Sequence, residues 1–249
     1  LESASMGLAK AVCVVLGLFV ALAAGGGMGS SSAAQARQAA SAVTVVCSLS
    51  GAPKGKSAFD RDSVCAAFSD QIGSALGAQV VFVTGPADVP PPDNVEVITV
   101  QTAQQMKDAV EAALPVDAAV FAAAVADWRV SSASDRKLKK TKDGLPVLEF
   151  AENPDILHGV SQMKQGRPPL VVGFAAETND VIENATAKRL RKGCDWIVAN
   201  DVSPATGIMG GTENAVTLIS DAGAEEWPRM TKDAVAQKLA ARIAAAITA

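Results

Sequence analysis

Lysines with regular spacing are the residues of this sequence most able to do chemistry. Lys188 and Lys192 are four residues apart, so a helix over 178–192 places both ammonium groups on one face. Lys137 opens a Lys-Leu-Lys-Lys run in which alternate lysines would share one face of a strand. Two ammonium groups on one face of that strand would suit a polyphosphate. The alternatives are a solvated charged face and, before Gly193, basic residues that complement a helix C-terminus.

Two further candidates follow expected strands. Small side chains at Ala123, Ala124 and Val125 would let a ligand approach the backbone closely. Asp127 then offers a lone carboxylate for a sugar hydroxyl or an amino group, unless it only caps a turn. Phe174 ends another expected strand, where its ring would pack against a base or belong to the core.

The segment Asn153-Pro154-Asp155-Ile156 predicts the start of a helix, with Asn153 as the N-cap and Pro154 at the first position. The free amides at such a start can bind an anion or the edge of a base. The alternative is a cap with no ligand.

A third phosphate-binding candidate lies near the N-terminus. Residues 50–57 are one residue away from the pattern G-x-x-x-x-G-K-[ST], with Ser50 in place of the first glycine. Gly55, Lys56 and Ser57 would then cradle phosphates. A phosphate-loop nucleotide hydrolase is therefore an alternative function.

Composition excludes several classes of protein. The 249 residues are 49% hydrophobic and 19% charged, which is enough apolar surface for a globular core and excludes a disordered chain. The absence of tyrosine excludes tyrosine-dependent dehydrogenases, and one histidine, His158, cannot build a multi-histidine metal site. The four cysteines lack CxxC spacing, so we expect neither a metal centre nor a redox pair. The net charge of −4 predicts no nucleic-acid partner.

Short apolar runs alternate with amphipathic stretches from residue 42 onward. The expected strands are 42–48, 79–84, 95–100, 118–123, 170–174, 196–199 and 215–220, and the expected helices are 59–76, 102–113, 154–164, 178–192 and 231–248. This alternation predicts an α/β fold: a Rossmann-like, open, mostly parallel sheet with helices on both faces. An antiparallel excursion over 136–151, with a turn at 142–144, could pair with a second subunit.

Residues 1–40 differ from the rest, and we expect one domain over 41–249. The segment has a lysine, an apolar run over 11–24 and a Gly/Ser stretch, which is the layout of a secretory signal. The alternatives are a helix or strand of the core and a leader that is not native to the protein. The apolar run is shorter than the roughly 20 residues of a membrane helix. We therefore expect no membrane attachment. The later sequence is typical of a nucleotide-using protein of the cytoplasm, so we expect a cytoplasmic location, with export as the alternative.

The motifs AAVADW, KLKK, NPDI, VVGFAAET, KRLRKGCDWIVAND and GTEN occur in this order. Their order resembles the phosphopantothenate-cysteine ligase domain of bacterial coenzyme A synthesis over residues 79–249. The resemblance implies a Rossmann-like, dimeric ligase that uses CTP and Mg²⁺. The carboxylate of 4′-phosphopantothenate would attack the α-phosphorus of CTP, and the amine of cysteine would then displace CMP from the acyl-cytidylate.

The resemblance also implies a role for each candidate residue. Residues 123–125 and Asp127 would meet the ribose and triphosphate region, and residues 153–156 would bind cytosine through main-chain groups. Phe174 would pack against the nucleotide. The phosphates would be held by Lys137, Lys188 and Lys192, which are the expected catalytic residues.

The N-terminal third departs from the family pattern. The family has an N-x-SSG segment whose asparagine handles the acyl-cytidylate, whereas no asparagine precedes Asn94 here. A CTP-binding module without acyl transfer is therefore a further alternative. The family often joins this domain to a flavin-dependent decarboxylase, which predicts a decarboxylase partner for this chain.

Overall fold

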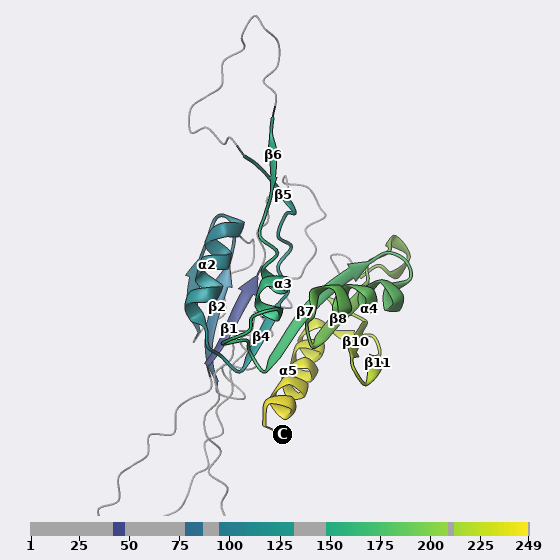
Figure 1. The fold of residues 1–249 in the computed structure, drawn as a ribbon. Coiled ribbons are helices and arrows are strands. Elements are labelled where there is room, and N and C mark those ends of the chain that lie inside the picture. Colours follow the sequence, from purple (N-terminus) through teal and green to yellow (C-terminus); the bar gives the residue numbers. More distant parts are fainter. Residues whose placement is uncertain (1–41, 48–77, 87–94, 132–147, 209–211, 249) are drawn as a thin grey trace, which may run out of the picture.

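The computed structural model describes residues 42–47, 78–86, 95–131, 148–208 and 212–248. An eight-stranded sheet with the order β11-β10-β8-β7-β4-β1-β2-β3 forms its centre (Figure 1). Its strands are β1 (Ala42–Cys47), β2 (Gln79–Thr84), β3 (Glu96–Thr99), β4 (Ala118–Phe121), β7 (Leu170–Glu177), β8 (Trp196–Asp201), β10 (Val216–Ser220) and β11 (Gly223–Glu226).

The sheet is parallel from β3 to β8, and β10 and β11 continue it in antiparallel pairing. Numbered among themselves, the parallel strands have the 3-2-1-4-5-6 order of the doubly wound fold. The expected Rossmann-like class is confirmed. In such sheets, ligands bind beyond the carboxyl ends of the strands.

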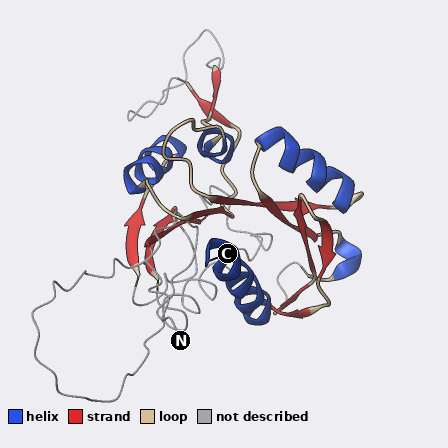
Figure 2. Cartoon of the chain, turned by 60° about the horizontal axis from the view of Figure 1, so that its bottom comes forward, coloured by secondary structure: helices blue, strands red, loops and turns tan. Residues whose placement is uncertain are grey.

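Helices cover both faces of the sheet (Figure 2). On one face lie α2 (Ala103–Ala113), α3 (Ile156–Ser161) and α4 (Val181–Lys192), and on the other lies α5 (Lys232–Thr248). A capping box between Thr102 and Gln105 begins α2. Gly193, in the left-handed conformation with φ 74°, ends α4. The remaining short elements are η1 (Pro204–Thr206) and the paired β9 (Glu213–Asn214) and β12 (Met230–Thr231).

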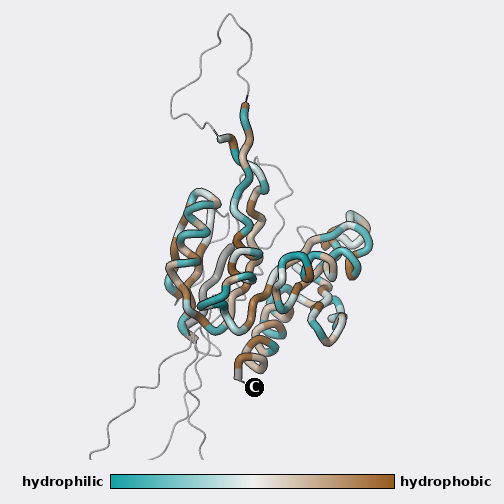
Figure 3. The backbone as a smooth tube through the Cα atoms, in the orientation of Figure 1, coloured by the Kyte–Doolittle hydropathy of each residue, from teal (hydrophilic) through white to brown (hydrophobic). Residues whose placement is uncertain are grey.

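The core lies between these layers. Every residue of β4 is buried, as are Val171 and Val172 of β7 and Ile197 of β8. Figure 3 shows apolar segments along the central strands, while polar and apolar positions alternate in α2. The continuous apolar runs that predicted these strands reflect burial on both faces.

A two-stranded antiparallel ribbon, β5 (Trp128–Val130) and β6 (Phe150–Glu152), projects from the body (Figure 1). The expected antiparallel excursion is therefore present, but its described pairing uses β5, which lies before the expected segment. The expected turn at 142–144 lies outside the described residues. Trp128 and Phe150 are exposed on this ribbon.

Several boundaries differ from the sequence prediction. β7 continues to Glu177, so Phe174 lies within the strand rather than at its end. α3 is shorter than expected, and α4 begins at Val181 rather than at 178. β9, β11 and β12 were not predicted. The expected helix over 59–76 and residues 1–40 lie outside the described part of the chain.

Candidate functional site

A pocket of about 190 Å³ opens beside the carboxyl ends of β4 and β7, under α3 and α4. Ten of the twelve expected binding residues line it: Ala123, Val125, Asp127, Asn153, Pro154, Asp155, Ile156, Phe174, Lys188 and Lys192. Ala124 is exposed and is not part of the lining. Lys137 and the candidate phosphate loop with Gly55, Lys56 and Ser57 lie outside the described residues. The structure thus gathers segments far apart in the sequence around one cavity.

The two lysines reach the pocket from adjacent turns of α4, as their spacing predicted. The ammonium of Lys188 donates to the backbone carbonyl of Phe174 at 2.9 Å. The ammonium of Lys192 forms an ion pair with the Asp155 carboxylate. Lys188 is thus anchored on β7, whereas Lys192 is anchored on the segment that begins α3.

Asp155 is the N-cap of α3, which corrects the expectation that Asn153 caps this helix. One carboxylate oxygen of Asp155 accepts a hydrogen bond from the backbone N–H of His158 at 3.0 Å. This contact satisfies one of the amides that were expected to be free for a ligand at this helix start. Pro154 therefore precedes the cap instead of occupying the first helical position.

The pKa of Asp155 lies below its ordinary value. Burial alone would raise the pKa, but the Lys192 ammonium and the His158 amide favour the carboxylate and outweigh it. Asp155 is therefore charged at neutral pH.

Asn153 joins two walls of the pocket. Its backbone N–H donates to the carbonyl of Asp127 at 2.8 Å, and its side-chain Nδ2 donates to the carbonyl of Ala126 at 2.8 Å. Arg129, from β5, donates to the carbonyl of Glu152 and to Asn153 Oδ1. The base of the ribbon and the wall that carries Asp127 are therefore held together through Asn153.

Three lining residues were not predicted: Phe121, Ala126 and Leu157. Phe121 ends a fully buried strand, so its apolar pattern is the same as that of a core residue. Leu157 lies on the first turn of α3, next to the predicted NPDI segment. Its proximity to that motif is the only sequence signal that could have identified it.

Gly173 permits the close approach of α3 to the sheet. A Cβ at this position would lie 2.7 Å from Leu157 Cδ2 and 2.8 Å from Ile197 Cδ1. A larger residue here would force the side chain of Leu157 or Ile197 to move, and Leu157 forms part of the pocket wall.

The histidine of the chain, His158, and the buried Cys194 thiol stand apart from the expected chemistry. His158 is not among the lining residues, and its Nδ1 lies 3.3 Å from the backbone carbonyl of Lys192. Burial raises the pKa of the Cys194 thiol to about 11, so this thiol is protonated at neutral pH. In the described ranges, no cluster of three or more His, Cys, Asp or Glu side chains could hold a metal ion.

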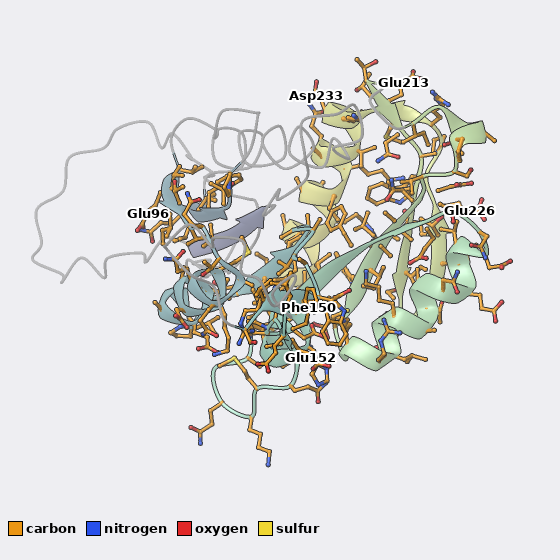
Figure 4. The ribbon with its side chains drawn as sticks, turned by 90° about the horizontal axis from the view of Figure 1, so that it is seen from above. Glu96, Phe150, Glu152, Glu213, Glu226 and Asp233 are labelled. Carbon is orange, nitrogen blue, oxygen red and sulfur yellow. The ribbon has the colours of Figure 1, made fainter. Side chains whose placement is uncertain are left out.

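The surroundings of the pocket are seen from above in Figure 4. Phe150 and Glu152 of the ribbon lie between the two ends of the sheet, which Glu96 and Glu226 mark.

Of the helices in the described residues, none is both long enough and apolar enough to cross a bilayer.

Comparison with known proteins gives consistent relatives. Residues 66–247 match the sequence model of the DNA/pantothenate metabolism flavoprotein C-terminal domain. The chain is 41% identical over 175 residues to the coenzyme A biosynthesis bifunctional protein CoaBC of Vibrio vulnificus strain YJ016, covering 70% of this chain and 43% of that protein. It is 40% identical over 166 residues to the CoaBC protein of Escherichia coli strain K12, covering 66% of this chain and 41% of that protein.

Solved structures agree with the sequence matches. The C-terminal domain of a CoaBC protein superposes with a TM-score of 0.57 at 33% identity, covering 73% of this chain and 80% of that one. The chain spans about two-fifths of the length of the curated relatives that it matches.

Proposed function

Because the chain belongs to the family of DNA/pantothenate metabolism flavoprotein C-terminal domains, we propose that it joins 4′-phosphopantothenate to cysteine, using CTP. The relatives are named for coenzyme A biosynthesis, and the chain matches less than half of their length. The family match covers residues 66–247, and the proposal concerns the ligase step of that pathway.

One observation carries the proposal: a single pocket combines a small-residue backbone segment, the Asp127 carboxylate and the ammonium groups of Lys188 and Lys192. These are the groups that a nucleoside triphosphate needs. The carboxylate can accept from a sugar or amino group, the small residues admit the ligand to the backbone, and the ammonium groups can bind phosphates.

The size of the pocket limits what it can enclose. A volume of about 190 Å³ is below the roughly 300 Å³ of sites that surround a whole small molecule. We therefore assign to it one part of CTP, with cytosine against residues 153–156 and the first phosphates beside the lysines. Lys137, which follows β5 in the sequence, is proposed to bind a phosphate as well.

In the proposed reaction, a carboxylate oxygen of 4′-phosphopantothenate forms a bond to the α-phosphorus of CTP, and the bond to the leaving pyrophosphate breaks. The cysteine amine then attacks the acyl carbon, CMP leaves and the amine loses a proton. Neither step needs a nucleophile from the protein. The work of Lys188 and Lys192 is to orient the phosphates and to stabilise the charge that develops there.

Magnesium fits this proposal as part of the nucleotide rather than as a resident ion. Mg²⁺ at nucleotide sites is usually held by one or two carboxylates together with substrate phosphates. The pocket offers Asp127 and Asp155, and the latter is paired with Lys192. We therefore propose that Mg²⁺ arrives bound to the triphosphate and reduces its charge, with Asp127 as the carboxylate that could face it.

The assembly and location belong to the same proposal. We propose that the protein is a homodimer in the cytoplasm. We also propose that it works with a decarboxylase that consumes the product, because the relatives are named as bifunctional proteins. No nucleic acid is involved in this scheme.

The test follows pyrophosphate and CMP when the protein is incubated with CTP, Mg²⁺ and 4′-phosphopantothenate, with and without cysteine. Release of both products that depends on cysteine is the expected result. Pyrophosphate release with little CMP would show activation without acyl transfer. Binding of CTP with neither product would leave only the CTP-binding module, and the ligase would be rejected.

A further inference from the structure

The carboxylate of Asp155 needs an explanation beyond the stability of the fold. A neutral asparagine caps a helix as well as aspartate does. The side chains of Lys192 and Asp155 are 21% and 46% exposed, and an ion pair this open to water contributes little stability. Neither the cap nor the ion pair accounts for a negative charge in a pocket proposed to bind phosphates.

The position of Lys192 is fixed from several sides. Its ammonium pairs with Asp155, and its backbone carbonyl contacts His158 Nδ1 at 3.3 Å and accepts from Gln162 Nε2 at 3.4 Å. All these partners belong to α3 or its flanking residues. Lys192 therefore remains at the rim of the pocket with its charge balanced by a neighbouring carboxylate.

The charged side chains of the described lining balance one another. Two are lysines, Lys188 and Lys192, and two are aspartates, Asp127 and Asp155. A phosphate group that approaches Lys192 also approaches Asp155, and the repulsion offsets part of the attraction. This repulsion would lower the affinity of the pocket most for free polyphosphates, because they have no nucleoside part to contribute to binding.

We propose that Asp155 is a counter-ion that sets the selectivity of the pocket, lowering its affinity for phosphates so that binding depends on the nucleoside. This proposal rests on the proposed function, in which pyrophosphate forms in the site and must leave. A site with uncompensated lysines would retain pyrophosphate and would bind unrelated polyphosphates. Asp155 thereby favours the release of pyrophosphate and the discrimination of CTP from other polyphosphates.

The test compares the wild type with Asp155→Asn by calorimetric titration with tripolyphosphate, CTP, CMP and cytidine, at one fixed free magnesium concentration. Asparagine keeps the cap of α3, so the variant is expected to fold. Affinity should rise about tenfold for tripolyphosphate and about threefold for CMP, with cytidine unchanged. Added salt should shrink these gains because it screens the removed charge.

The control is Glu111→Gln. Glu111 pairs with Lys107 on α2 at 2.8 Å, outside the pocket, so this change alters the net charge equally but leaves the site intact. It should change none of the affinities. An Asp155→Asn variant that binds all four ligands equally more tightly, no more tightly, or more weakly overturns the counter-ion proposal.

The two proposals fail separately. A wild type that releases no CMP in the presence of cysteine removes the ligase function, while the tripolyphosphate comparison still decides the effect of Asp155. Turnover by the wild type together with an unchanged tripolyphosphate affinity in the variant removes the counter-ion proposal and leaves the ligase.

Discussion

The rim of the pocket and the far end of the sheet use similar charged groups for different purposes. At the far end, Glu225 accepts from Trp227 Nε1 at 3.0 Å and pairs with Arg242 at 2.8 Å. Lys238 lies 4.5 Å from the centre of the Trp227 ring. These groups surround a buried indole and join α5 to β11.

At the pocket rim, the partners are arranged around a cavity. Lys192 pairs with Asp155, but an ammonium carries three N–H donors, and the pair lies at the edge of the space where a ligand would bind. The role of a charged side chain thus depends on what surrounds it. The charged groups around the Trp227 ring anchor α5 to β11, whereas the charged groups around the cavity remain available to a ligand.

The largest expected effect is a loss of stability at the far end of the sheet that leaves the pocket unaffected. Trp227→Ala should lower the free energy of unfolding by about 3–5 kcal/mol, because it empties a buried site. Urea denaturation measures this loss, and the folded variant should keep its affinity for CTP. The control is Leu190→Ala, which truncates an exposed side chain and should change stability by about 0.5 kcal/mol or less.

The next effect concerns binding. Lys188→Ala should weaken CTP binding roughly tenfold to hundredfold, because it removes a charged donor from the pocket. Its stability should change far less than that of Trp227→Ala. Lys107→Ala, which removes a lysine from an ion pair on α2, should leave CTP affinity unchanged in the same titration. Equal losses in the two variants would contradict the assignment of the phosphate site.

A third change alters the wall of the pocket. Gly173→Ala should cost about 1–3 kcal/mol of stability and weaken CTP binding, since the new Cβ displaces Leu157. Gly159→Ala is the matched control within α3, where a Cβ meets nothing within 4 Å. That control should be stabilising by about 0.5–1 kcal/mol, as alanine is the better helix former. Unaltered CTP affinity in the Gly173 variant would show that this wall does not touch the ligand.

The smallest effect is a dependence on pH. The pKa of Asp155 is lowered in the folded protein, so the ionised carboxylate stabilises the fold. This contribution is complete at pH values above the ordinary pKa of aspartate, about 4, and is lost as the pH falls through the lower pKa of the folded protein. Its half-exposed pair limits this contribution to about 0–1 kcal/mol. The difference in unfolding free energy between wild type and Asp155→Asn should therefore shrink between pH 6 and pH 3. A difference that grows on acidification would reverse the assigned sign.

The strands of the sheet could be predicted from the sequence because buried parallel strands are continuous apolar runs. The pocket could be predicted in outline because its polar residues follow those runs, where a doubly wound sheet binds ligands. Lys188 and Lys192 share a helix face by spacing alone. Whether these residues bind CTP remains a prediction.

Other features depend on contacts that no local pattern encodes. Asn153 was expected to cap α3, but its amide bonds to Ala126, a residue distant in the sequence, and Asp155 takes the cap. Phe121 resembles a core residue because a pocket wall and a core have the same apolar pattern. The cluster around Glu225 likewise joins separate elements, so its role became visible only in the folded chain.

The outermost strands of the described sheet, β3 and β11, bear on association between molecules. An edge strand offers unpaired backbone groups to any other strand. β3 carries Glu96 and β11 carries Glu226, both exposed and at opposite ends of the sheet (Figure 4). In a protein with a net charge of −4, a second copy that aligned its edge here would bring carboxylates against carboxylates. The same acidic groups therefore oppose extension of the sheet into aggregates at both ends.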